Sequence, residues 1–309
     1  MQEYLAKTLQ GLEGVLADEL RALGAKDIQV QRRAVSFKGD KKCLYKANFW
    51  LRTALRILKP VATFQVKSPD DVYTAIKKLK LEEFITADKT FSIDTTVYSE
   101  TINHSRYVTY KAKDAIVDYF SEKYGKRPSV SVANPDIYFN LHISHTTCTL
   151  SLDSSGAPLF KRGYRVAQTE APINEVLAAG LLMLSGWKGQ CDFIEPMCGS
   201  GTIAIEAAMI ALNMAPGLFR KEFAFERWAD FDRDMFDEIY NDDSLEREFK
   251  HKIYASDVSA KAIGIANANI KSAGLSRYIE TKVMDIAEMP VQEKPIHSVF
   301  NPPYGERLS

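Results

Sequence analysis

The chain has 309 residues, 46% of them hydrophobic, and its 40 basic and 40 acidic residues cancel. This size allows two or three packed domains. No apolar run is long enough to cross a bilayer, which excludes a membrane-spanning helix, and Met1 leads into an amphipathic segment rather than a secretory leader. The four cysteines form no CxxC pair and the histidines do not cluster, so we expect a cytoplasmic protein with no metal site.

Charge is divided unevenly along the chain. The front half, residues 1–165, holds 26 basic and 18 acidic residues, a net of +8. The back half, residues 166–309, holds 14 and 22, a net of −8. A basic front half favours a nucleic acid as partner and leaves the chemistry to the back half, although solvated faces can also differ in charge without functional meaning.

Residues 1–60 predict a small α/β unit. Apolar residues at helical spacing indicate a helix over 13–23, alternation indicates a strand over 28–37, and a second helix is expected over 41–56, ended by Pro60.

Residues 61–153 predict a second unit of the same mixed kind. Its expected elements are strands at 61–66, 91–98, 137–143 and 147–153 and helices at 69–79 and 107–124.

Residues 154–172 are rich in Ser, Gly and Pro and predict a linker. Beyond them, residues 173–309 alternate buried helices with short apolar strands. These strands, at 192–195, 252–257, 279–283 and 298–300, predict a parallel, Rossmann-like α/β domain.

The first of these strands runs into a glycine turn, Glu-Pro-Met-Cys-Gly-Ser-Gly-Thr, at 195–202. In a doubly wound sheet, a ligand lies beyond the carboxyl ends of the strands. Glycines let the backbone approach such a ligand, and the helix that follows offers free N–H groups to a carboxylate such as that of S-adenosylmethionine. We therefore predict a donor site formed by Glu195, Met197, Gly199, Gly201 and Thr202, although a GxG sequence alone is as often only a tight turn.

Two acids end the next strands. Asp257 lies where the ribose hydroxyls of a nucleoside ligand would be, and Asp285 lies where its adenine would be. Their simpler interpretations are a helix N-cap for Asp257 and a solvated loop acid for Asp285.

The fourth strand precedes Asn301-Pro302-Pro303-Tyr304. The Asn301 side chain and the Pro302 carbonyl can accept the two N–H groups of an exocyclic base amine, and Tyr304 can stack on the base. A nicotinamide dehydrogenase would share the glycine turn but has no use for this motif. The alternative is a surface turn, which Asn-Pro often forms.

These motifs carry a resemblance that covers the whole chain. Its marks are LDSSGAPLFKRGYR at 152–165, EPMCGSGT at 195–202, ASDVSAKAI at 255–263, NANIKSAGL at 267–275 and NPPYGERL at 301–308. The chain resembles the THUMP-domain RNA guanine-N2 methyltransferases, most closely the bacterial enzymes that act on large-subunit ribosomal RNA and their YpsC-like relatives.

The resemblance implies a ferredoxin-like segment at 1–60, a THUMP RNA-binding domain at 61–153 and a methyltransferase domain at 173–309. It implies S-adenosylmethionine as cofactor, ribosomal RNA as partner, and an insertion around residues 226–238. This chain has Glu195 where the family usually has Asp. Methyltransferases of this fold also continue for about three more strands, so the domain is expected to be incomplete after the NPPY motif, with an edge that a second copy in a homo-oligomer could cover.

Three functions therefore stand at this point. The first is an RNA methyltransferase that forms N2-methylguanine, in 23S ribosomal RNA or in tRNA. The second is an adenine-N6 methyltransferase acting on DNA, since an NPPY motif can bind the exocyclic amine of adenine as well. The third is a non-catalytic RNA-binding or assembly protein.

Overall fold

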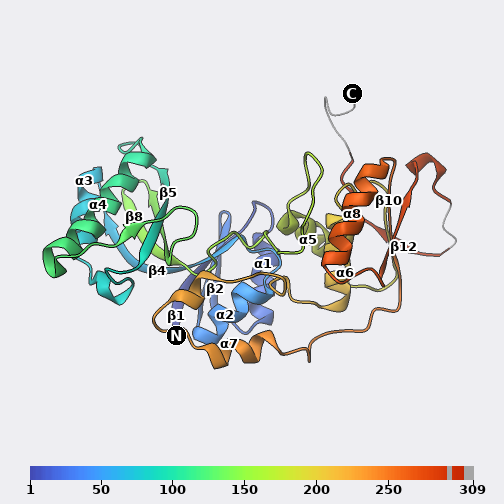
Figure 1. The fold of residues 1–309 in the computed structure, drawn as a ribbon, viewed down its shortest axis with the longest axis horizontal. Coiled ribbons are helices and arrows are strands. Elements are labelled where there is room, and N and C mark those ends of the chain that lie inside the picture. Colours follow the sequence, from blue (N-terminus) through green and yellow to red (C-terminus); the bar gives the residue numbers. More distant parts are fainter. Residues whose placement is uncertain (291–293, 303–309) are drawn as a thin grey trace.

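A computed structural model describes residues 1–290 and 294–302 of the chain (Figure 1). The front half is built on one eight-stranded sheet with the order β2-β3-β1-β4-β8-β7-β5-β6. Its strands are β1 (Gln2–Lys7), β2 (Lys26–Gln31), β3 (Ala34–Gly39), β4 (Arg56–Gln65), β5 (Thr90–Tyr98), β6 (Ser129–Val130), β7 (Ile137–Ser144) and β8 (Thr147–Asp153). Its helices are α1 (Glu13–Ala22), α2 (Lys41–Trp50), α3 (Pro69–Lys77), α4 (Ser105–Tyr124) and the 3₁₀ turn η1 (Leu81–Glu83).

Strand β4 joins the two units of the front half into one sheet. It pairs antiparallel with β1 at Arg56–Leu58 and with β8 from Leu58 to Gln65. The helix predicted over 41–56 ends at Trp50, so its last six residues are wrong, and β4 begins at Arg56 and runs through Pro60. Proline is tolerated there because the pairing with β1 has already ended at Leu58 and the register with β8 shifts just after Pro60.

Four further strands of the front half, β1, β2, β3 and β6, differ from the prediction. The single strand expected at 28–37 is the hairpin β2–β3, whose turn holds Arg33 at a φ of 58°. Strands β1 and β6 were not predicted. Helices α1, α3 and α4 and the antiparallel pair β7–β8 are confirmed.

The back half holds a four-stranded parallel sheet with the order β11-β10-β9-β12. Its strands are β9 (Asp192–Glu195), β10 (Ile253–Asp257), β11 (Ile279–Val283) and β12 (Ile296–Ser298), the last beginning two residues before the predicted strand. Helices α5 (Glu175–Leu184), α6 (Thr202–Leu212) and α8 (Ala260–Ser272) and the turn η3 (Ile286–Glu288) complete it. The strand order reverses between β9 and β12, which places a switch point, and hence the expected ligand site, at the end of β9.

Between α6 and β10 the chain returns to the front half. This strap, residues 213–249, contains η2 (Ala224–Arg227) and α7 (Arg233–Tyr240), and α7 lies along α2 (Figure 1). Phe225 stacks on Tyr45 of α2 with ring centroids 4.4 Å apart, and Phe236 packs edge-on against both rings. Phe223, Phe225 and Phe236 thus belong to the hydrophobic core of the front half.

No helix within 1–290 or 294–302 combines the length and apolar character that crossing a bilayer requires.

Candidate functional site

The glycine turn after β9 forms a cradle open to a ligand. Gly199 and Gly201 have φ values of 50° and 76°, which favour glycine. A Cβ on Gly201 would lie 3.1 Å from Ala266 of α8, so this glycine allows close helix packing. A Cβ on Gly199 would meet only the Thr169 hydroxyl, at 3.9 Å, so the space beside Gly199 is open for a ligand to approach the backbone.

Asp257, at the end of β10, faces this cradle. One carboxylate oxygen accepts a hydrogen bond from the Gly199 N–H at 3.0 Å and the other accepts one from the Ser259 N–H at 2.9 Å. The N-cap of α8 is Ser259, whose side chain accepts from the Ala262 N–H, so the simpler interpretation of Asp257 as that cap is wrong. Asp257 is half-buried, which leaves its remaining lone pairs able to accept from a ligand.

Glu195 is buried, with 2% of its surface exposed, and accepts a hydrogen bond from the Ala204 N–H at 2.8 Å. Burial, with a contribution from the Asp257 charge, raises the pKa of Glu195 well above its usual value. The carboxyl group therefore serves first as a partner for the start of α6.

Thr202 begins α6, as predicted, and its hydroxyl accepts a hydrogen bond from Arg165 Nη2 at 2.9 Å. Met197, in the middle of the turn, is half-buried.

Asp285 is exposed after β11, and its carboxylate accepts from the Ala287 N–H at 2.8 Å, which caps η3. Since β11 is parallel to β10, Asp285 lies at the same edge of the sheet as Asp257.

Asn301 and Pro302 lie at this edge too. Strand β12 pairs in parallel with β9, and the Ser298 hydroxyl donates to the Ile194 carbonyl at 2.8 Å. The chain then leaves the sheet, and both Asn301 and Pro302 are exposed. Parallel neighbours end at the same edge, so Asn301-Pro302 follows the strand beside the glycine turn. Tyr304 lies outside the described residues.

Residues 166–169, which the motifs did not single out, are hydrogen-bonded to the glycine turn at Ser200 and to Asn269 of α8. The Ser200 hydroxyl accepts from the Thr169 N–H at 2.9 Å. Asn269, on α8 and 1% exposed, accepts from the N–H groups of Val166 and Ala167 and donates to the carbonyls of Ala167 and Ser200. These contacts join residues distant in sequence, and the only signal for Asn269 was its place in the NANIKSAGL motif.

Cys198, inside the turn, is buried in the hydrophobic core of the back half. Burial raises the pKa of its thiol, which opposes formation of a nucleophilic thiolate. Within the described part of the chain, no three His, Cys, Asp or Glu side chains are grouped as metal ligands.

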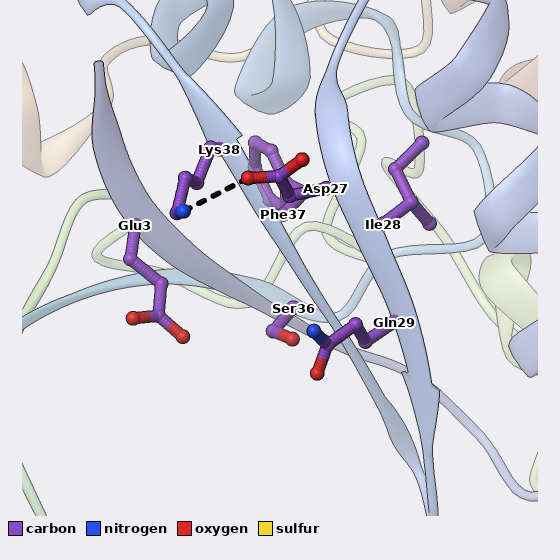
Figure 2. Close-up of a pocket in the computed structure, with 7 residues that line it drawn as sticks. All are labelled: Glu3, Asp27, Ile28, Gln29, Ser36, Phe37 and Lys38. Atoms are coloured by element: carbon purple, nitrogen blue, oxygen red, sulfur yellow. Dashed lines mark ion pairs between the residues drawn. The ribbon is translucent and has the colours of Figure 1, made fainter.

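A separate hollow of about 370 Å³ lies on the front half, on strands β1, β2 and β3 (Figure 2). Lys38 Nζ forms an ion pair with Asp27 at 2.8 Å, and Glu3 adds a second carboxylate to the lining. With two acids and one base, this hollow is not suited to a polyanion.

Comparisons with known proteins agree with this architecture. Residues 3–58 match the RlmL ferredoxin-like domain, residues 66–153 the THUMP domain, and residues 162–309 the RMKL-like methyltransferase domain. The fold and the cradle thus define a methyltransferase with a THUMP domain in front. The chain belongs to the family of THUMP-domain methyltransferases that combine these three domains.

Three relatives span almost the whole chain. A Synechocystis protein described as "Putative RNA methyltransferase" is 36% identical over 307 residues, which are 99% of this chain and 80% of that protein. The structure of SMU.472, described as a putative methyltransferase complexed with SAH (S-adenosylhomocysteine), has a TM-score of 0.88 and 30% identity, covering 100% of this chain and 82% of the other. A predicted N6-adenine-specific DNA methylase from Listeria monocytogenes has a TM-score of 0.89 and 33% identity, covering 99% and 81%.

Proposed function

We propose that this protein is an S-adenosylmethionine-dependent RNA methyltransferase that forms N2-methylguanine in 23S ribosomal RNA, in the cytoplasm. The observation that carries the proposal is the placement of Asn301-Pro302 after β12, next to the strand whose glycine turn forms the ligand cradle. A cradle and an amine-binding motif at one edge are what methyl transfer to a base amine requires.

The residues present fit the donor. Gly199 lets the backbone approach it, Gly201 lets the start of α6 pack closely on α8, the N-terminus of α6 faces its carboxylate, and Asp257 accepts from its ribose hydroxyls. Met197 and Asp285 are the remaining residues of the proposed donor site, on the side where its adenine would lie. When bound, S-adenosylmethionine supplies a methyl group on a positively charged sulfur. The relative complexed with S-adenosylhomocysteine supports this assignment.

The motif after β12 holds the target amine. The Asn301 side-chain oxygen and the Pro302 carbonyl accept its two N–H groups, which orients the nitrogen lone pair, and Tyr304 stacks on the base. Pro302, directly after the asparagine, has no N–H group that could compete as a donor, and it stiffens the loop.

The nucleic acid is assigned from the front half. Its net charge of +8 and its match to the THUMP domain favour RNA, as does the description of the Synechocystis relative. A second candidate, adenine-N6 methylation of DNA, is favoured by the description of the Listeria relative.

Labelled S-adenosylmethionine offered with large-subunit ribosomal RNA, tRNA and duplex DNA separates the candidates, with mass spectrometry of the nucleosides as readout. We expect N2-methylguanosine in the large-subunit RNA. N2-methylguanosine in tRNA alone would show that the substrate is tRNA rather than ribosomal RNA. N6-methyladenosine in DNA would replace the proposal by the second candidate. If no substrate is methylated and S-adenosylhomocysteine does not bind, the protein is a non-catalytic RNA-binding protein.

A further inference from the structure

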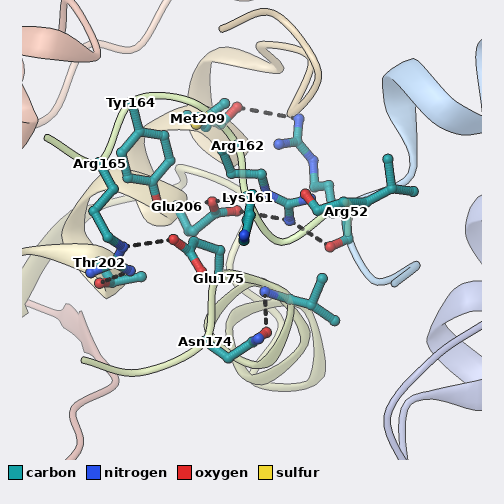
Figure 3. A network of polar contacts seen from close by, with 12 residues as sticks. Arg52, Lys161, Arg162, Tyr164, Arg165, Asn174, Glu175, Thr202, Glu206 and Met209 are labelled. Atoms are coloured by element: carbon teal, nitrogen blue, oxygen red, sulfur yellow. Dashed lines mark hydrogen bonds and ion pairs between the residues drawn. The ribbon is translucent and has the colours of Figure 1, made fainter. Parts of the chain in front are cut away.

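Helix α6 connects the donor cradle with the front half. It begins at Thr202, beside Gly201, and is buried along its whole length. A hydrogen-bonded helix moves as one body, so contacts anywhere along α6 fix the position of the cradle. Three arginines from outside the helix form hydrogen bonds with it (Figure 3). Arg165 bonds at its start, Arg162 at its middle and Arg52 at its end.

Arg162 holds the middle of the helix. Its Nε lies 3.3 Å and its Nη2 3.5 Å from the two carboxylate oxygens of Glu206, and the two side chains are 1% and 0% exposed. Arg162 Nη2 also donates to the backbone carbonyl of Arg52 at 2.6 Å, and the Tyr164 hydroxyl donates to Glu206 at 3.1 Å. One guanidinium therefore contacts both α6 and the backbone of the front half.

Arg52 holds the far end. Its Nη2 donates to the carbonyl of Met214, just after α6, at 2.7 Å, and to that of Met209 at 3.4 Å. Burial lowers the pKa of Arg52 to about 10, so it stays charged at neutral pH. The backbone N–H of Arg52 donates to Glu19 of α1 at 2.7 Å, which anchors this residue in the front half.

Arg165 holds the start of α6. It donates to the Thr202 hydroxyl at 2.9 Å, while its Nε donates to Glu175 of α5 at 2.8 Å. A buried ion pair is weak evidence for stability, because desolvation offsets the attraction between the charges. Geometry is the stronger reason for this arrangement, since it ties α6 to the front half and to α5 with directional bonds.

We propose that Arg162 is a positioning residue for methyl transfer, which, together with Arg52 and Arg165, fixes the donor cradle relative to the RNA-binding front half. This rests on the proposed function. Arg162 and Arg165 bind side chains of α6 itself, and Arg52 binds the carbonyls of Met209 in its last turn and of Met214 just after it. RNA bound by the front half then places its target amine at the donor only while the helix keeps this position.

The test removes the central ion pair without leaving a buried charge. The double variant Arg162→Met with Glu206→Met keeps similar volume, and such replacements are often neutral or stabilising. We expect thermal stability and the affinities for S-adenosylhomocysteine and for RNA to stay close to wild type. The rate of methyl transfer with both substrates saturating should fall about 10- to 100-fold, since a misplacement of about 1 Å can cost that much.

The control is Lys252→Met with Glu280→Met, which removes an exposed ion pair of 2.9 Å between the residue before β10 and a residue of β11, remote in its bonding from α6 and the front half. It should leave the rate unchanged. Should the double variant fail to fold, Arg162→Lys keeps the buried charge but not the forked reach to both Glu206 and the Arg52 carbonyl, and should show the same loss of rate.

A distance measurement separates this inference from the proposed function. Spin labels attached at Glu122→Cys on α4 and Lys271→Cys on α8 report the distance between the front half and the methyltransferase domain. Cys191→Ser removes the partly exposed native cysteine, which could also take up the label. We expect a narrow distance distribution that shifts or broadens in the double variant. A folded variant with the wild-type distribution and rate overturns the positioning role. If wild-type protein methylates no RNA, the proposed function fails, while the distance distribution still decides whether the arginines fix the orientation.

Discussion

Asp257 supports the donor cradle with one carboxylate oxygen and the loop before α8 with the other. We expect Asp257→Ala to weaken binding of S-adenosylhomocysteine about 10- to 150-fold, because a charge-assisted hydrogen bond to the ribose contributes about 1.5–3 kcal/mol. RNA affinity should be nearly unchanged. Calorimetry measures both.

Ser259→Ala is the control for Asp257→Ala, since it removes the cap of α8 without touching the glycine turn. It should cost about 1 kcal/mol of stability and leave donor affinity intact. If Asp257→Ala binds the ligand as wild type does, Asp257 only organises the backbone.

Asn301→Ala tests the chemistry at the neighbouring strand end. It should reduce turnover strongly with little change in donor or RNA affinity, because the role we propose for its side chain is to position the amine in the transition state. Single-turnover rates at saturating RNA measure this. A variant that turns over near the wild-type rate would show that the amine is held by other groups.

Glu195 carries a pH dependence of stability. Its folded-state pKa is raised above the usual value of 4.5, so the folded protein binds this proton more tightly than the unfolded chain. The resulting stability is fully present below pH 4.5 and is lost as the pH rises through the raised pKa. We expect Glu195→Gln to melt at a higher temperature than wild type at about pH 8 and at the same temperature at about pH 4. A difference in melting temperature between Glu195→Gln and wild type that is the same at about pH 4 and about pH 8 would contradict the assignment.

The sequence located some parts of this site and not others, for a physical reason. Gly199, Gly201 and Asp257 were predicted because a turn and a strand end leave local signals. The bonds from Arg165 to Thr202 and from Asn269 to Ser200 span 37 and 69 positions, and no local pattern encodes such contacts.

At the scale of elements, α7 is the part of the strap that binds the front half. Phe236 is 6% exposed and packs edge-on against Tyr45, Phe49 and Phe225. We expect Phe236→Ala to destabilise the protein by about 3–5 kcal/mol, through lost burial and the cavity left behind. Denaturant unfolding measures the loss, and hydrogen exchange should show weaker protection in α2.

Tyr240→Ala is the comparison for Phe236→Ala, because Tyr240 lies on the same helix but is 42% exposed. Its effect should be clearly smaller. Unchanged protection of α2 in the Phe236 variant would mean that α7 does not support the front half.

The elements themselves were predicted where their periodicity is local and strong. Helices α1, α3 and α4 end near their expected positions. The hairpin β2–β3 was missed because its turn uses Arg33 rather than glycine, and β4 was misjudged because proline is acceptable where one neighbouring strand has ended. The docking of α7 on α2 is a tertiary contact that no sequence window contains.

At the scale of the whole molecule, charge and packing divide the chain differently. Charge changes sign near residue 165, but the core of the front half includes Phe223, Phe225 and Phe236 from the strap. Residues 1–165 alone would therefore expose the apolar surface that the strap covers. RNA binding by the front half is best tested in the whole chain.

We expect RNA affinity to fall steeply with salt, with a slope of about −0.7 to −0.9 in log affinity against log salt for each phosphate neutralised. Reversing two exposed charges of the front half, Lys126→Glu with Arg127→Glu, should weaken binding and make the slope shallower. Reversing two exposed charges of the back half, Lys271→Glu with Arg277→Glu, changes the net charge equally and should leave both nearly unchanged. Fluorescence anisotropy of labelled RNA over a salt series gives affinity and slope together. Equal losses in the two variants would mean that the RNA responds to the net charge of the molecule, and the basic front half would then not be its binding surface.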